Sequence, residues 1–438
     1  MGSPTRRSIL ALAVPVTVAN SAVPLLGLVD TAVIGRSGKA EELGAIALGA
    51  LVFNFVYWGF GFLRMGTSGF TARAAGAGDA LEVRATFVRA LLAGLAIGVV
   101  LFALQWPIER VALHLLEASE AVHRDTSAYF RVRIWGAPAT LATFAIFGAL
   151  VGLGRTRALM ILQLVLNGLN AALNVAFVLG LGLGVRGVAL GTVVSEWIVL
   201  GLGLFAMRSL LPKAAVRLDA RVVFDRARWI ATFRANTDIM IRTLVLLAGF
   251  AWFTRESASF GDVPLAANHI LLQIISFSAF FLDGYAFVVE ALVGQAIGAR
   301  DHARFASALR RSTELAAVTA IALSLVAFFA GPALFDALTT NAEVRAEAMR
   351  RLPYAAVYIL VSFVAFQLDG AFIGATETKP MRDTAILSFS LFFVASLLLV
   401  PLLGVDGLWI AFVLYVVARG VTLGAHLPRL FRRARGDD

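Results

Sequence analysis

The chain has no cysteine, only five histidines among its 438 residues, and only 15% charged residues. The lack of cysteine excludes a disulfide framework, a thiol nucleophile and a cysteine-ligated metal centre. The sequence also lacks a Walker phosphate loop, a HExxH zinc motif and a GxSxG nucleophile elbow. ATP hydrolysis and the chemistry of those motifs are therefore not expected. No clustered nucleophile, base or metal set is visible, so the sequence predicts no enzyme, no metal site and no cofactor.

The low charge content points to a membrane protein, because soluble domains carry about 25% charged residues and this chain is 59% hydrophobic. Apolar stretches close to the ~20 residues needed to cross a bilayer recur along the chain. They lie near 8–35, 43–70, 86–106, 127–153, 159–182, 187–208, 235–255, 264–296, 312–332, 352–375, 383–403 and 407–426. The first leads into a polar, charged turn, so we interpret it as a retained helix and not as a signal peptide. The predicted fold is all-α, with twelve transmembrane helices.

The two halves of the chain resemble each other. Residues 43–79 align without a gap with 265–301, a shift of 222 positions. The same shift places Gly148 on Gly370 and Gly152 on Gly374. Internal repeats of this kind are typical of secondary transporters.

The repeat predicts two lobes, residues 1–208 and 235–438, with a site between them and a basic linker at 209–234. Because each half has an even number of helices, we expect both halves to share one orientation, related by an axis along the membrane normal.

The net charge of +10 is unevenly distributed. With loops assigned alternately to the two sides, about 24 of the 38 basic residues lie on the side of the N-terminus, as the positive-inside bias predicts. Both termini are therefore expected in the cytoplasm of a bacterial cell, with the chain in its plasma (inner) membrane. The basic excess also predicts attraction to anionic membrane lipids. No basic face interleaves with aromatic residues, so no nucleic-acid partner is expected.

Ionisable residues at membrane depth are the first functional candidates, because each is costly there and usually faces a cavity or a partner. The predicted helices carry six such acids and three such bases: Asp30, Glu196, Asp238, Asp283, Glu290 and Asp369, against Arg64, Arg242 and Arg419. This count predicts an acidic interior that suits cations or protons. The alternative is that some acids pair with arginines or lie nearer the membrane interface.

Asp30 is the strongest candidate. It lies in PLLGLVDTAVIG, among apolar and small neighbours, and Pro24 six residues earlier frees the carbonyl of Asn20 and permits a bend. Burial disfavours the charged carboxylate, so we expect a group that takes up a proton near neutral pH. The alternative is a carboxylate satisfied by a neighbouring hydroxyl or by Arg64. The equivalent position of the second half, Trp252, is not ionisable.

The fifth predicted helix carries Asn167, Asn170 and Asn174 at i, i+3 and i+7, a spacing that aligns three amides along one face. Exposure to lipid would be costly, so this face should point inward, near Asp30. The amides can bind a cation, bind substrate or hold helices together.

The second half has its own polar positions. Helix eight carries a stripe of Gln273, Ser276, Asp283 and Glu290. On helix seven, Asp238 and Arg242 are at i and i+4, so an ion pair within that helix is expected. His269 is interpreted as a hydrogen-bonded structural residue.

Five segments of the sequence carry a resemblance to a known family: LVDTAVIG around Asp30, FLRMGTSGFTARAAGAGD, NTDIMIR, LDGYAFVVEALVGQAIGARD and LDGAFIGAT. Together they span nearly the whole chain. They resemble the multidrug and toxic compound extrusion (MATE) family, and within it the DNA-damage-inducible F (DinF) branch.

The resemblance implies two six-helix lobes in a V-shaped antiporter of the MATE/MOP type. Such a protein exports amphipathic or cationic organic compounds in exchange for protons or sodium, as a monomer among membrane lipids. Asp30 matches the first-helix carboxylate that binds the coupling ion, and Asn170 and Asn174 match a fifth-helix pair that is Asn followed by Asp in many relatives. With Asn174 in the second place, protons are favoured over sodium.

Asp238, Arg242, Asp283 and Glu290 match polar positions of the branch's second lobe. The resemblance and the buried charges together give one expected substrate cavity, lined by Asn20, Arg64, Asn167, Glu196, Asp238, Arg242, Gln273, Asp283, Glu290 and Asp369. The alternative in transport is a flippase for lipids or lipid-linked precursors, which related families of the same fold include. A flippase would be expected to have a more basic cavity.

Overall fold

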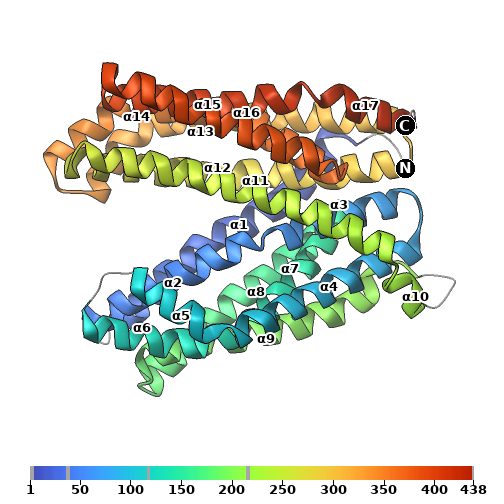
Figure 1. Cartoon of the computed structure of the whole chain (residues 1–438), viewed down its shortest axis with the longest axis horizontal. Coiled ribbons are helices and arrows are strands. Elements are labelled where there is room, and N and C mark those ends of the chain that lie inside the picture. Colours follow the sequence, from blue (N-terminus) through green and yellow to red (C-terminus); the bar gives the residue numbers. More distant parts are fainter. Residues whose placement is uncertain (1–3, 36–39, 116–118, 214–217, 437–438) are drawn as a thin grey trace. The chain divides into compact units, whose positions relative to one another are not determined.

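The computed structural model describes residues 4–35, 40–115, 119–213 and 218–436, except the side chains of residues 23–26, 28–31, 40 and 115. In these ranges every regular element is a helix (Figure 1). The first half contains α1 (Arg6–Gly35), α2 (Ala40–Gly59), α3 (Phe62–Gly76), α4 (Ala80–Ala103), α5 (Gln105–Leu115), α6 (Glu120–Arg133), η1 (Ile134–Gly136), α7 (Ala137–Gly152), α8 (Thr156–Asn174), η2 (Val175–Gly180), α9 (Gly184–Leu210) and α10 (Ala220–Val223). The second half contains α11 (Arg226–Ser259), α12 (Asp262–Gly298), α13 (His302–Leu338), α14 (Ala342–Gly374), α15 (Thr378–Leu403), α16 (Val405–Gly424) and α17 (Leu427–Arg435).

Within the described residues, eleven helical segments are long and apolar enough to cross a membrane, and each overlaps one of the last eleven predicted stretches. The first predicted stretch lies in α1, which has 30 residues. The all-α membrane fold is therefore confirmed. Helices α11, α13 and α14 begin 9 or 10 residues before the predicted stretches. Their first turns are charged but helical, and hydropathy detects only the apolar part of each helix.

By contacts the chain divides into two compact units, Val18–Thr232 and Met1–Thr17 together with Phe233–Asp438. The first turns of α1 pack with the second unit, where Ile9 and Ala13 are buried beside Tyr285 on α12 and Ala308 on α13. The predicted division at residue 208 did not include this contact, because a repeat pattern does not reveal which helices a terminal segment touches.

The internal repeat is visible in the packing of each unit. A Cβ atom on Gly148 of α7 would overlap the carbonyl oxygen of Arg64 on α3, and one on Gly370 of α14 would overlap that of Ala286 on α12. Both members of the second pair lie 222 positions after those of the first. Equivalent glycines therefore allow equivalent helix pairs to approach closely in both units.

The second unit also has an aromatic core. Phe253, Trp409 and Phe412 are fully buried and contact one another, with ring centroids 4.5–6.2 Å apart. The indole nitrogen of Trp409 donates a hydrogen bond of 2.9 Å to Asn268, so its one polar atom is satisfied. Such a core fixes α11, α12 and α16 of the second unit against one another.

Candidate functional site

In the first unit, a buried polar network joins α8 to α9. The amide nitrogen of Asn174 donates to Oδ1 of Asn170 at 2.8 Å, and that of Asn170 donates to Oγ1 of Thr192 at 2.8 Å. Asn170 and Asn174 are 1% and 0% exposed. Gly191 on α9 makes room for the network, because a Cβ atom there would overlap Oδ1 of Asn174.

This arrangement agrees with the inward-facing stripe for Asn170 and Asn174, while Asn167 is half-buried. In the described structure the two amides hold α8 and α9 together, which is one of the roles that the sequence left open. Asn20 on α1 and Arg64 on α3 are half-buried in their helices. The side chain of Asp30 lies outside the described residues, so its predicted proximity to the stripe stays a prediction.

A π-helix, Val175–Gly180, begins directly after Asn174. The wider turn changes the register of α8 at the end of the asparagine stripe. π-helical turns are rare and frequently occur at functional sites, because they move side chains out of the α-helical pattern. The residue spacing alone gave no sign of this segment.

The first unit also contains a buried ion pair between α6 and α9. Arg133 donates from Nη1 and Nη2 to Oε2 and Oε1 of Glu196, at 2.8 and 2.7 Å, and both residues are 7% exposed. The guanidinium carbon of Arg133 also lies 5.1 Å from the ring centroid of Phe53 and 5.4 Å from that of Tyr57. Glu196 was predicted to line the cavity, but its carboxylate is occupied by an arginine that the sequence reasoning missed. Arg133 lies inside the predicted stretch 127–153, so counting every charge in that stretch would have found it.

In the second unit, Asp238 and Arg242 bind other helices and not each other. Asp238 on α11 accepts from Thr378 at 2.9 Å and from Arg382 at 2.7 Å, both on α15. Arg242 donates to Asp369 on α14. The predicted pair within one helix is therefore wrong, because partners on facing helices lie within reach of both side chains.

Asp369 also binds a second arginine. Nη2 of Arg419 on α16 donates to the same Oδ2 atom at 2.9 Å. Two guanidinium groups on one carboxylate leave this cluster with a formal charge of +1. The predicted cavity acid Asp369 is thus the centre of a positively charged cluster that joins α11, α14 and α16.

The residues of the stripe predicted on α12 differ in their exposure. Gln273 and Ser276 are exposed, with Gln273 3.4 Å from the ring nitrogen of His269, whereas Asp283 is half-buried and Glu290 is 1% exposed. The stripe itself is therefore exposed in the N-terminal half of α12 and buried at Glu290, while another face of the N-terminal half, with Asn268 and Leu271, is buried in the core. The spacing showed a common stripe but not where along the helix burial begins.

The buried charges are balanced. Among the described residues, four glutamates and four arginines are buried: Glu42, Glu109, Glu196, Glu290, Arg89, Arg133, Arg242 and Arg351. The prediction of an acidic interior counted only three bases, so it does not hold for the buried residues. Three of the six acids that were expected to suit a cation, Glu196, Asp238 and Asp369, have an arginine partner instead.

Comparison with known proteins identifies the family. The family model MatE matches residues 15–176 and 239–399, once in each half, in agreement with the internal repeat. The chain is 36% identical to DNA damage-inducible protein F of Escherichia coli (strain K12), over 96% of this chain and 92% of the relative. It is 26% identical to multidrug resistance protein NorM of Vibrio cholerae, over 96% and 94% of the two chains.

The fold agrees with this result. A multidrug resistance MATE family transporter of the MOP superfamily in an outward-facing conformation superposes with a TM-score of 0.86 at 21% identity, over 98% of this chain and 96% of that one. A MOP superfamily transporter from Pyrococcus furiosus gives 0.87 at 20% identity, over 99% and 97%. The chain belongs to the MatE family of multidrug and toxic compound extrusion transporters, and within it resembles DNA damage-inducible protein F.

Proposed function

We propose that this protein exports amphipathic or cationic organic compounds across the bacterial plasma membrane in exchange for protons, with Asp30 as the coupling residue. The observation that carries the proposal is its membership, over nearly the whole chain, in a transporter family whose relatives include proteins named for multidrug resistance. The sequence has no phosphate loop for ATP, so an ion gradient is the energy source that we propose.

The distribution of buried charge supports Asp30 as the coupling group. Among the other acids predicted at membrane depth, Glu196, Asp238 and Asp369 are held by arginines. A carboxylate with a permanent cationic partner is already compensated and exchanges protons less readily than one without. Asp30 lies on a helix whose apolar and small residues supply no such cation within a full turn on either side.

Asn170 and Asn174 are the polar groups that we propose to act with Asp30. Both are uncharged, so a site made with them holds at most one carboxylate charge from Asp30 and suits one proton. Proton binding and substrate binding favour different conformations of the lobe, and this difference in affinity drives the exchange.

The test is uptake into everted membrane vesicles. A fluorescent organic cation is added under a proton gradient alone and, separately, under a sodium gradient alone. We expect accumulation under the proton gradient, its loss when a protonophore is added, and none under sodium. Vesicles without the protein are the control. Accumulation driven only by sodium would overturn proton coupling, and translocation of labelled phospholipid without cation uptake would favour the flippase.

A further inference from the structure

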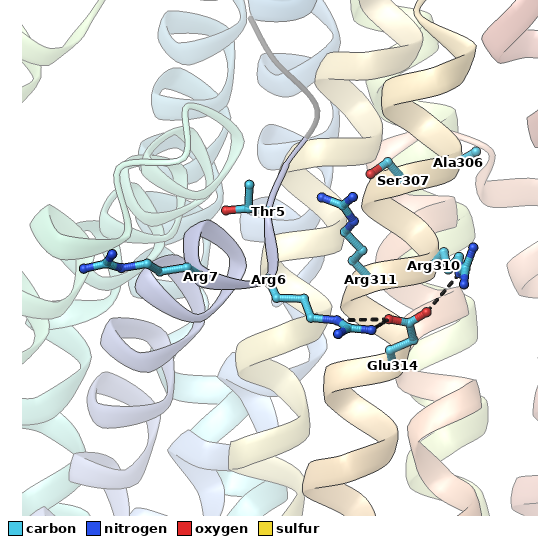
Figure 2. Close-up of a pocket in the computed structure, with 8 residues that line it drawn as sticks. All are labelled: Thr5, Arg6, Arg7, Ala306, Ser307, Arg310, Arg311 and Glu314. Atoms are coloured by element: carbon cyan, nitrogen blue, oxygen red, sulfur yellow. Dashed lines mark hydrogen bonds and ion pairs between the residues drawn. The ribbon is translucent and has the colours of Figure 1, made fainter.

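A basic pocket lies between the first turn of α1 and the start of α13 (Figure 2). It has a volume of about 730 Å³, and eight residues line it: Thr5, Arg6, Arg7, Ala306, Ser307, Arg310, Arg311 and Glu314. All of them belong to the same compact unit. Four arginines and one glutamate give the lining a formal charge of +3, and neither the proposed transport nor the packing of the unit uses this excess.

The only acid of the lining is occupied. Glu314 accepts from Nη2 of Arg6 at 2.6 Å and from Nε of Arg310 at 2.9 Å, as the dashed lines in Figure 2 show. Arg311 extends toward the N-terminal segment, where its Nη1 donates to the carbonyl oxygen of Pro4 at 2.6 Å. These bonds fix three of the guanidinium groups around the pocket and leave most of their N–H donors for an added anion.

The pocket lies at the depth of lipid headgroups. At 1.5 Å per residue, the 37 residues of α13 extend over roughly 55 Å, well beyond a hydrocarbon core of about 30 Å. The apolar part of α13 begins just after Glu314, with LAAVTAIALSLVAFF. Likewise, Arg6 and Arg7 directly precede the apolar part of α1. Both helices therefore present their arginines where a phosphate group lies in a bilayer.

We propose that this pocket binds the phosphate of an anionic phospholipid headgroup. Under the positive-inside assignment the lipid lies in the cytoplasmic leaflet, where basic pockets between transmembrane helices bind such headgroups. The arginines offer planar, paired N–H donors that match phosphate oxygens, and Thr5 and Ser307 add hydroxyl groups to the lining. The headgroup would join the start of α1 to α13 and so reinforce the contacts that Glu314 and Arg311 already make.

Two substitutions with opposite effects test the proposal. In Arg311→Gln the pocket loses one charge, and we expect phospholipid to bind about fivefold more weakly, since one basic residue near a membrane contributes about 1 kcal/mol. Glu314→Gln removes the only acid and frees Arg6 and Arg310, so tighter binding of the same lipid is expected. Arg432→Gln is the matched control, because Arg432 is an exposed arginine of α17 that does not line the pocket.

Binding is measured on the purified full-length protein in detergent. Native mass spectrometry counts retained lipid, and thermal unfolding is followed with short-chain phosphatidylglycerol, with phosphatidylcholine of the same chain length, and with inorganic phosphate. We expect stabilisation by phosphatidylglycerol alone, reduced in Arg311→Gln and increased in Glu314→Gln. Equal stabilisation by inorganic phosphate would show a site for free phosphate and overturn the lipid assignment. Equal binding in wild type and both pocket variants would overturn the site itself. Neither measurement depends on transport.

Discussion

At the scale of single residues, most charges inside this transporter serve packing. Arg133 with Glu196, Asp238 with Arg382, and Asp369 with Arg242 and Arg419 each join helices of one unit. A buried pair gains little over apolar packing, but removal of one partner leaves an uncompensated charge and costs about 3–5 kcal/mol. These residues should therefore affect stability before they affect transport.

The pair of Arg133 and Glu196 allows a direct test. We expect Arg133→Met to lower the midpoint of thermal unfolding of the purified protein strongly, because Glu196 stays buried without its cation. The double variant Arg133→Met with Glu196→Leu should recover much of the loss, since neither charge remains. Arg124→Met is the matched control: Arg124 lies on the same helix, its side chain is 78% exposed, and its contact of 3.7 Å with the half-buried Asp125 contributes little. A stable single variant would contradict the structural role.

Asp30 should behave differently. We expect Asp30→Asn to abolish gradient-driven export while the protein remains folded and inserted in the membrane, and substrate binding that survives should lose most of its pH dependence. A shift of a two-state equilibrium from 1:99 to 99:1 requires about 5.5 kcal/mol, and the loss of one desolvated charge is large enough to supply it.

The measurement is uptake by everted vesicles under a proton gradient, with protein amount matched by immunoblot. Asp262→Asn, an exposed acid in the first turn of α12, is the control and should transport normally. Export by Asp30→Asn at a rate near that of wild type would move the coupling role to another acid, with Glu290 and Asp283 the first to examine.

At the scale of helices, the repeat was the most reliable guide. The shift of 222 positions predicted the correspondence of Gly148 with Gly370 and of Gly152 with Gly374, and these glycines pack at equivalent positions of the two units. Hydropathy located the spans because the bilayer imposes a minimum apolar length on each helix.

The ion pairs could not be predicted in the same way. Asp238 and Arg382 are 144 residues apart, and their contact depends on how α11 packs against α15. The i, i+4 spacing of Asp238 and Arg242 was visible in the sequence, but it shows only that a pair within one helix is possible. The π-helix after Asn174 likewise depends on tertiary packing, so residue spacing carried no signal for it.

Close helix packing at the glycines yields a further prediction. We expect Gly374→Ala to lower the midpoint of thermal unfolding, with a cost of about 1–3 kcal/mol, because the new methyl group would overlap the backbone carbonyl of Glu290 and force α12 and α14 apart. Gly201→Ala on α9 is the control. Apart from the backbone of its own helix, no described atom lies within 4 Å of a Cβ atom there, so this substitution should be neutral or slightly stabilising, since alanine favours the helix. Equal stability of the two variants would show that α12 and α14 separate at no cost.

At the scale of the whole molecule, contacts within each unit support the assignment of successive loops to opposite sides of the membrane. In the first unit, Arg89 donates to the carbonyl oxygen of Val222 at 3.1 Å. This contact brings the start of the third span, α4, beside the linker that follows the sixth span, α9. In the second unit, Arg6 reaches Glu314 near the start of the ninth span. Each contact joins segments that an even number of crossings places on the same side of the membrane as the N-terminus.

The last prediction concerns which side that is, and the absence of cysteine makes it easy to test, because every added cysteine is the only thiol in the chain. Lys213 lies after the sixth span and Thr340 after the ninth, and both are exposed. With basic loops in the cytoplasm, a membrane-impermeant maleimide should label Lys213→Cys in everted vesicles and not in intact spheroplasts. Thr340→Cys should show the reverse.

Labelling of both positions from one side would contradict the alternation of the loops, and a reversed pattern would contradict the positive-inside assignment. The unmodified chain is the control and should give no signal in either preparation. Because Arg6 and Arg310 are bonded to Glu314 on the side that Lys213 reports, the same experiment also determines which leaflet supplies the phospholipid proposed for the basic pocket.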